Sequence, residues 1–180
     1  NNRGAGLQLL SYNNGAMRRV LVSFLLSAAA VLAQDSAFLK QGTVSNRAVM
    51  LFSNDKLELA IAVQGGSLLS LVMRDDPSQL SPFGDTSARI YGHFVCVDGF
   101  GPSSAEERAA GLPGHGEAHR QPWEMTASGK QGNTASVTFR VKLPLVQETL
   151  TRSFHIVDGE NVIYVDSELE SHLAFDRPVN

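Results

Sequence analysis

Apolar residues alternate with polar residues at a period of two through most of the sequence after Gln34. The clearest run is residues 135–143, in which Val137, Phe139, Val141 and Leu143 share one face. Successive side chains of a β-strand point to opposite faces, so this alternation predicts strands with one buried face. Such strands are typical of antiparallel sheets that another layer covers on one side. The predicted fold class is therefore all-β, an antiparallel β-sandwich.

Turn residues divide the alternating runs. Residues 56–63 and 67–73 flank Gly65 and Gly66, which predicts a β-hairpin. Residues 150–156 alternate up to a turn at 157–160, except that Arg152 stands on their apolar face, and residues 161–169 are predicted to form another strand. This order of short strands and turns favours a sandwich over a wound parallel sheet.

One segment predicts a helix. Ser104 and Glu107 have the spacing of a capping box, and Gly111 is placed to end a helix of about two turns. This helix lies on a long connection, residues 98–116, that carries glycine and proline. Long loops on a β-scaffold are where binding sites tend to lie.

The start of the chain predicts export. Arg18 and Arg19 follow Met17, residues 20–33 form an uncharged apolar run of 14 residues, and Val-Leu-Ala precedes Gln34. A membrane-spanning helix needs ~20 residues, so this run is typical of a cleaved signal peptide, with a buried helix as the alternative. We predict a signal peptide at residues 17–33, a periplasmic or secreted location and no stable membrane anchor after cleavage. Residues 1–16 are expected to be a non-native extension upstream of the true start.

The net charge limits the classes of partner that the chain can bind, and the cysteine content limits its disulfides. The chain has 15 basic and 18 acidic residues, and three of the basic residues but none of the acidic ones precede residue 34. Residues 34–180 therefore carry 12 basic and 18 acidic groups, a net charge of −6. Because this part of the chain is negatively charged, it is a poor partner for nucleic acid or anionic lipid. The lone Cys96 cannot form an intrachain disulfide and is expected to be a small buried residue.

The densest polar cluster is at residues 114–123. If this segment enters a strand, His115, Glu117 and His119 point to one face and have the residue types of metal ligands. No cysteine pair or His-x-His accompanies them, so we predict no metal. A sugar site uses the segment differently: Trp123 supplies a ring for a pyranose face, and His115, Glu117, His119 and Arg120 supply hydrogen bonds. The alternative is that Trp123 belongs to the core and the polar residues form a solvated loop.

The same segment resembles a motif of the galactose mutarotase-like superfamily, the aldose 1-epimerases and hexose-6-phosphate epimerases. The latter carry His-Gly-Phe-Ala-Arg and a Trp eight residues after the His; here His115-Gly116-x-Ala118 is followed by Trp123 at that spacing. Residues 65–71, 150–154 and 162–165 also resemble this superfamily. His119 stands where the phosphate-sugar epimerases have Arg, which argues against a phosphorylated substrate. The resemblance covers residues 45–180 and implies the mutarotase-like supersandwich.

The resemblance also implies an activity. An aldose 1-epimerase interconverts the anomers of a free sugar by acid–base ring opening, which needs no cofactor. It implies a supporting role for His115, which holds a substrate hydroxyl. The main acid and base are expected beyond Asn180, because His172, the remaining histidine near the end, precedes the expected position of the acid. Residues 34–180 are therefore expected to be the N-terminal part of the sandwich, incomplete at its C-terminus and inactive alone.

Two rival functions remain open at this point. One is a non-catalytic carbohydrate-recognition domain of the same fold, since a fold does not fix a function. The other is a cupin-like metal-binding β-protein. The sequence leaves the identity of the sugar and the oligomeric state open.

Overall fold

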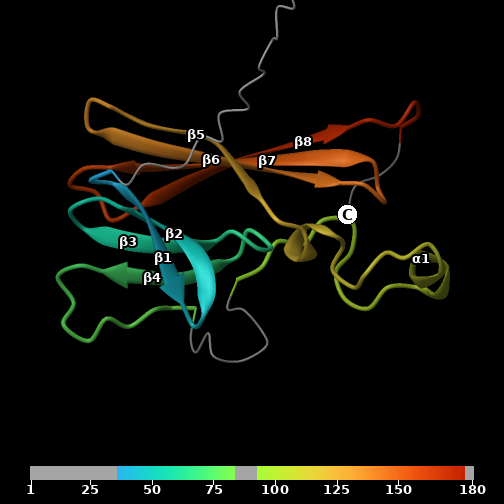
Figure 1. Cartoon of the computed structure of the whole chain (residues 1–180), viewed down its shortest axis with the longest axis horizontal. Helices are drawn as coiled ribbons and strands as arrows, with labels where there is room; N and C mark the ends of the chain where they lie inside the picture. The colour runs from blue at the N-terminus through green and yellow to red at the C-terminus, as the bar shows by residue number, and fades with distance from the viewer. Residues whose placement is uncertain (1–35, 84–92, 177–180) are drawn as a thin grey trace, which may run out of the picture. The chain divides into compact units, whose positions relative to one another are not determined.

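A computed structural model describes residues 36–83 and 93–176 of the chain. The predicted signal peptide and the extension before it lie outside the described residues. The described residues form two four-stranded antiparallel sheets, in each of which every strand pairs with the next one in sequence (Figure 1). The all-β sandwich predicted from the alternation is confirmed.

The first sheet contains β1 (Leu39–Val44), β2 (Arg47–Ser53), β3 (Leu57–Ala62) and β4 (Leu68–Met73). The predicted hairpin is the pair of β3 and β4, whose register shifts at a bulge between Ala60 and Ile61. Gly65 and Gly66 in its turn have φ of 85° and 61°, values that glycine adopts without strain.

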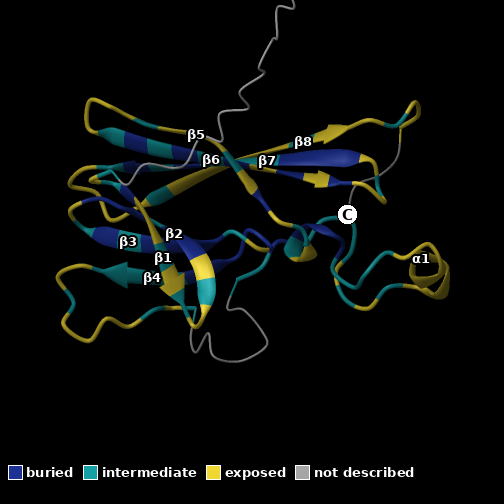
Figure 2. Ribbon diagram, in the orientation of Figure 1, coloured by how far each residue is buried: buried dark blue, intermediate teal, exposed yellow. Residues whose placement is uncertain are grey.

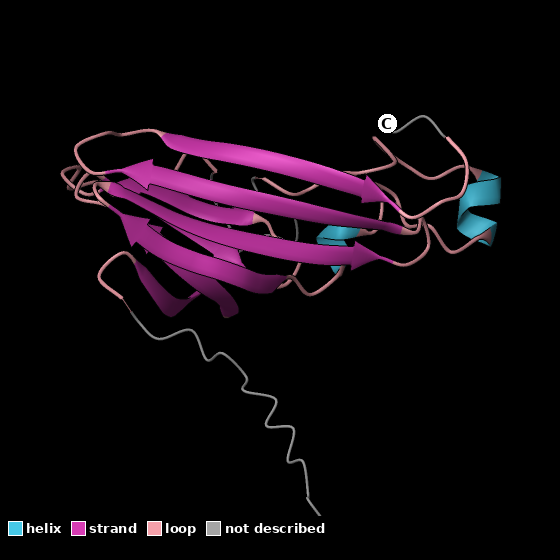
Figure 3. Ribbon diagram, turned by 90° about the horizontal axis from the view of Figure 1, so that it is seen from above, coloured by secondary structure: helices cyan, strands magenta, loops and turns pink. Residues whose placement is uncertain are grey.

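The second sheet contains β5 (Glu124–Gln131), β6 (Thr134–Leu143), β7 (Glu148–Val157) and β8 (Ile163–Ser171). The strand predicted at residues 135–143 is β6, and the one predicted at 161–169 is β8, displaced by two residues toward the C-terminus. Seen from above, the strands of this sheet run side by side, with both helical segments near one end of the strands (Figure 3).

The main core lies between the sheets. Alternate residues of β3 and β6 face it and are fully buried, which is the result that their period of two predicts. Figure 2 shows β3 mostly in the colour of buried residues and β6 with buried residues alternating with less buried ones, whereas much of β8 is exposed. The largest side chains in this core include Phe52, Leu57, Leu59, Ile61, Phe139, Leu143, Phe154 and Ile156.

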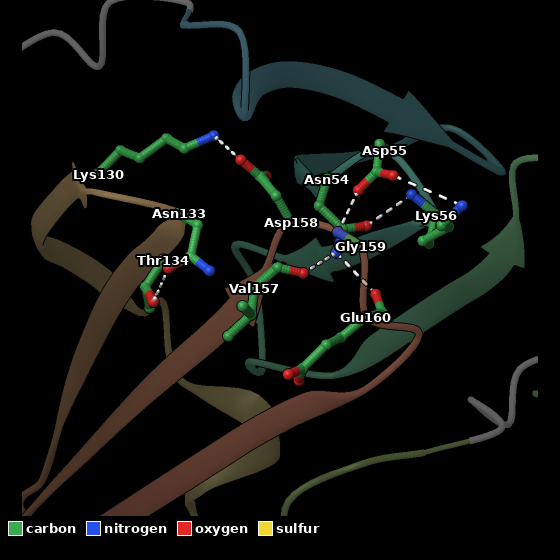
Figure 4. Close-up of polar contacts among 10 residues, drawn as sticks. All are labelled: Asn54, Asp55, Lys56, Lys130, Asn133, Thr134, Val157, Asp158, Gly159 and Glu160. Atoms are coloured by element: carbon green, nitrogen blue, oxygen red, sulfur yellow. Dashed lines mark hydrogen bonds and ion pairs between the residues drawn. The ribbon is translucent and has the colours of Figure 1, made fainter.

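Side chains of one turn join the two sheets at one end. The buried side-chain amide of Asn54, between β2 and β3, donates to the carbonyls of Val157 and Glu160 at 2.7 and 2.8 Å (Figure 4). The neighbouring Asp55 carboxylate accepts a hydrogen bond from the backbone N–H of Gly159 at 2.6 Å. The turns of the two sheets are therefore held in a fixed relation without disulfide bonds.

The connection between β4 and β5 carries α1 (Ala105–Ala109) and the 3-10 helix η1 (Ala118–Arg120). The capping box predicted for α1 is present: Ser104 Oγ accepts from the backbone N–H of Glu107, and the Glu107 carboxylate accepts from the backbone N–H of Ser104. Across residues 36–83 and 93–176, no helix has the length and hydropathy to cross a membrane.

Candidate functional site

The backbone at His115 and Gly116 makes a left-handed turn, with φ of 67° and 76°. A Cβ atom on Gly116 would stand 1.7 Å from the carbonyl oxygen of Val97, so no other residue fits without a shift of the backbone. His115 is thereby held in a conformation that is costly for a residue with a side chain. The His-Gly pair noted in the sequence therefore has a local structural cause.

Two hydrogen bonds to one residue orient the His115 ring. Its Nδ1 atom accepts from the backbone N–H of Gly101 at 3.2 Å, and its own backbone N–H donates to the Gly101 carbonyl at 3.1 Å. Cys96 Sγ lies 3.6 Å from the same Nδ1 atom. Because Nδ1 acts as an acceptor, the neutral imidazole carries its proton on Nε2. His115 therefore offers a hydrogen-bond donor, Nε2–H, from a fixed position.

A second histidine lies beside the first. The rings of His115 and His119 are 6.4 Å apart between centroids, and both pack edge-on against Phe94. Burial lowers the pKa of His119, and the positive charge of Arg120 and the neighbouring His115 lower it further. The Nε of Arg120 donates to His119 Nε2 at 3.3 Å. The lowered pKa favours the neutral form of His119.

A cavity of about 410 Å³ opens beside His115. Its walls come from the loop that precedes α1, from the helix itself and from the turn before η1. Phe100 stands in the wall of the cavity with 81% of its surface exposed. The lining residues that matter for a ligand are Asp98, Phe100, Ser103 and His115.

Glu117 points into the protein rather than into this cavity. It is 3% exposed, and its carboxylate accepts hydrogen bonds from the backbone N–H groups of Leu145 and Val146 at 2.9 and 3.1 Å. These two residues lie in the turn between β6 and β7. The structure therefore places Glu117 away from this cavity, where its carboxylate holds a turn in place.

Trp123 is also an internal residue, 4% exposed. Its ring lies against Gly66, where a Cβ atom would be 2.5 Å from the ring, and its Nε1–H donates to the Ala118 carbonyl at 3.0 Å. Its backbone N–H donates to the Val63 carbonyl at 2.8 Å. The structure therefore places Trp123 in the core, as the alternative interpretation has it, with its ring buried.

The polar cluster is not a strand, and this explains where its members point. Glu117 has helical φ and ψ values and η1 follows directly, so alternation does not apply to residues 115–119. His115 and His119 come together, Glu117 turns inward and Arg120 is exposed. Among the described residues, no three His, Cys, Asp or Glu side chains are placed to hold a metal ion.

His172 lies at the end of β8, away from the motif in sequence. Its Nε2 atom forms a hydrogen bond with Thr149 Oγ1 at 2.8 Å, and its backbone N–H donates to the Gln147 carbonyl at 2.9 Å. These contacts tie the end of β8 to the start of β7. They give His172 a structural role at a strand end.

The sequence interpretation missed Phe100 and Asp98 as cavity residues. The sequence does hold a signal for them, since Asp98-Gly99-Phe100-Gly101 places an aromatic residue between glycines in the long loop. Asp98 and Gly101 have positive φ values of 60° and 113°, so the loop is sharply bent there.

Comparisons with known proteins point to one fold. No family model and no curated protein matches the sequence. The crystal structure of "a putative mutarotase (YeaD) from Salmonella typhimurium" matches with a TM-score of 0.51 and 24% identity, over 69% of this chain and 45% of that one. A structure described as HI1317 matches with a TM-score of 0.48 and 14% identity, over 70% of this chain and 46% of that one.

The chain thus spans less than half the length of these two structures. The match to the mutarotase structure confirms, at the level of the fold, the resemblance that the His-Gly and Trp spacing indicated. Over the matched part, this chain has the galactose mutarotase-like fold.

Proposed function

We propose that this chain binds a free aldose or a related sugar unit in the cavity beside His115, as part of an aldose 1-epimerase-like protein. The observation that carries the proposal is the fixed His115 ring, whose Nδ1 is occupied by Gly101 and whose Nε2–H remains to donate. It lines a sugar-sized cavity within a mutarotase-like fold.

The cavity has the two kinds of surface that a sugar needs. The exposed ring of Phe100 offers an apolar face to the C–H groups of a pyranose. His115 Nε2–H, the Ser103 hydroxyl and the Asp98 carboxylate bring donors and acceptors for hydroxyl groups. Phe100 thus takes the stacking role that the sequence interpretation gave to Trp123.

The proposed reaction is the interconversion of sugar anomers. A base removes the proton of the anomeric hydroxyl while an acid protonates the ring oxygen; the ring opens, rotates about C1–C2 and closes on the other face. His115 would hold a hydroxyl near the ring oxygen. This chemistry moves protons only, so it requires no cofactor.

A donor-only His115 fits the second candidate equally well, a carbohydrate-recognition domain without catalysis. The accepting nitrogen of His115 is already engaged by Gly101, so the neutral ring acts as a hydrogen-bond donor and not as a base. Polarimetry separates the two candidates when the protein tested also carries the acid and base that the resemblance places after residue 180. An epimerase accelerates the mutarotation of fresh α-D-glucose or α-D-galactose above the uncatalysed rate, and a recognition domain leaves that rate unchanged.

Binding itself is tested by titration calorimetry with D-glucose and D-galactose. We expect Phe100→Ala to weaken binding about fivefold, because a lost aromatic contact is worth ~1 kcal/mol. His115→Gln is expected to weaken it further. Tyr164→Ala removes another exposed aromatic, on the outer face of β8, and serves as the control. Equal effects of Phe100→Ala and Tyr164→Ala would overturn the proposal.

A further inference from the structure

Arg152 occupies a position on β7 that the pattern of the strand reserves for apolar residues. Leu150, Phe154 and Ile156 on the same face of β7 are all buried. Arg152 is half-buried among them, with its guanidinium carbon 5.2 Å from the centre of the Phe154 ring. A cation on the inner face of a central strand is costly unless something compensates for it.

No acidic side chain of the described ranges compensates for this charge. The residues opposite Arg152 are Phe139 on β6 and Ser167 on β8. Within residues 36–83 and 93–176, Arg152 forms no ion pair with an acidic group. Burial lowers the pKa of Arg152, although a guanidinium stays charged at any physiological pH.

A second cavity, of about 380 Å³, lies where Arg152 meets the segment that precedes the site loop. Residues 93–97 and Phe100 form one wall, and Leu150, Arg152 and Ser167 of the second sheet form another. The His93 ring reaches this cavity with a buried Nδ1 atom that has no hydrogen-bond partner. An unsatisfied buried polar atom beside a cation that has no acidic partner among the described residues indicates a missing ligand.

We infer that this cavity binds an oxyanion group, a carboxylate or a phosphate, of a small ligand. The Arg152 guanidinium provides two parallel N–H donors, a geometry that matches either group. Ser167 contributes a third donor, its hydroxyl, and the unpartnered Nδ1 of His93 contributes a fourth when it carries the ring proton. Segment 93–97 supplies four apolar or weakly polar neighbours and no competing anion.

This inference goes beyond the proposed sugar site and does not depend on it. Arg152, His93 and Ser167 line the second cavity and not the one beside His115, and Phe100 is the residue that lines both cavities. A neutral sugar in that first cavity needs no cation. The anion site would therefore remain if the sugar proposal failed, and the reverse also holds.

The test is titration calorimetry at constant ionic strength, set with chloride so that screening stays fixed. The probes are acetate and D-glucuronate for carboxylates, inorganic phosphate and D-glucose 6-phosphate for phosphates, and D-glucose as the neutral control. We expect saturable binding of one class of anion. Comparison of the carboxylate titrations with the phosphate titrations identifies which group the site binds.

Two arginine variants locate the site. Arg152→Met is expected to weaken anion binding at least tenfold, and Arg152→Lys, which keeps the charge but loses the fork, is expected to be intermediate. Arg140→Met is the matched control, because Arg140 lies on the outer face of β6 and pairs with Glu124 at 3.9 Å. It is expected to bind as the unmodified chain does.

The thermal midpoint gives a second measurement. Anions that bind the folded state raise Tm, and this rise should be absent in Arg152→Met. Arg152→Gln replaces it if the methionine variant does not fold, which circular dichroism reports. Lack of saturable binding by all four anions, or equal losses in the Arg140 and Arg152 variants, would overturn the inference. An unchanged D-glucose affinity in Arg152→Met would separate this site from the sugar site.

Discussion

The backbone N–H of Gly101 donates to Nδ1 of His115, and the backbone N–H of His115 donates to the carbonyl of Gly101. This reciprocal pair joins the loop before α1 to the turn before η1. It sets both the orientation and the tautomer of the imidazole. The proposed sugar contact thus depends on backbone geometry more than on any neighbouring side chain.

Gly116 is predicted to be essential to that geometry. We expect Gly116→Ala to lower the free energy of unfolding by about 3 kcal/mol, because the new Cβ overlaps the Val97 carbonyl at a positive φ. Gly132→Ala is the matched control: its φ is 59°, but nothing lies within 4 Å of the added atom. That variant should cost about 1–2 kcal/mol. Urea unfolding measures both, and equal losses would refute the steric explanation.

Trp123 is predicted to act through stability. Trp123→Ala should cost about 3–5 kcal/mol, as for other large core aromatics. Trp123→Phe keeps most of the ring but loses the hydrogen bond to Ala118, which should cost about 1–2 kcal/mol. Calorimetry on the folded Phe variant should show an unchanged affinity for sugar. A selective loss of sugar binding without a loss of stability would return Trp123 to the binding site.

Asn54 is predicted to stabilise the contact between the two sheets. Its amide nitrogen bonds Val157 and Glu160, and its Oδ1 accepts from the backbone N–H groups of residues 56 and 57. Asn54→Ala would leave these groups without partners and should cost about 3 kcal/mol. The exposed Asn161→Ala should cost under about 0.5 kcal/mol. Similar thermal midpoints for the two variants would contradict this role.

Stability is predicted to fall as the pH drops below about 6.5. Burial lowers the pKa of both His93 and His119, so the unfolded chain takes up protons before the folded chain does. The histidine contribution is therefore intact above the usual pKa of 6.5 and is lost as pH falls toward the lowered folded values. The lowered pKa values of Asp55 and Asp76 affect the stability only when the pH falls near or below their usual pKa of 3.8.

Urea unfolding at pH 7.5, 6.0 and 5.0 checks this. His119→Gln should flatten the loss between pH 7.5 and 5.0, whereas His172→Gln, at an exposed strand end, should leave it as it is. A stability that rises on acidification over this range would show that the signs of these shifts are wrong.

The fold was predictable where a local pattern decides the structure. Alternation placed β6 correctly because one of its faces is buried along its full length, and the capping box placed α1 because its contacts lie within four residues. β5 was not singled out, since six of its eight residues are exposed and its sequence does not alternate. Pairing with β6, a contact between strands, holds it in the sheet.

The site was predictable only in part. The His-Gly spacing singled out His115, and the structure explains the glycine by its positive φ and its approach to the Val97 carbonyl. The direction of Glu117 and Trp123 depends on η1, whose position follows from contacts with the β6–β7 turn and with Gly66. Such contacts join residues far apart in the sequence, and spacing within one segment does not reveal them.

The central claim is that a free sugar binds in the cavity beside His115. Its most direct test is to titrate D-galactose and D-glucose into ¹⁵N-labelled protein and to follow the backbone amide signals by NMR. The account predicts saturable shifts concentrated at residues 98–103 and 112–116, which disappear in His115→Gln. Signals that do not shift, or saturable shifts confined to the outer face of β5–β8, would contradict it.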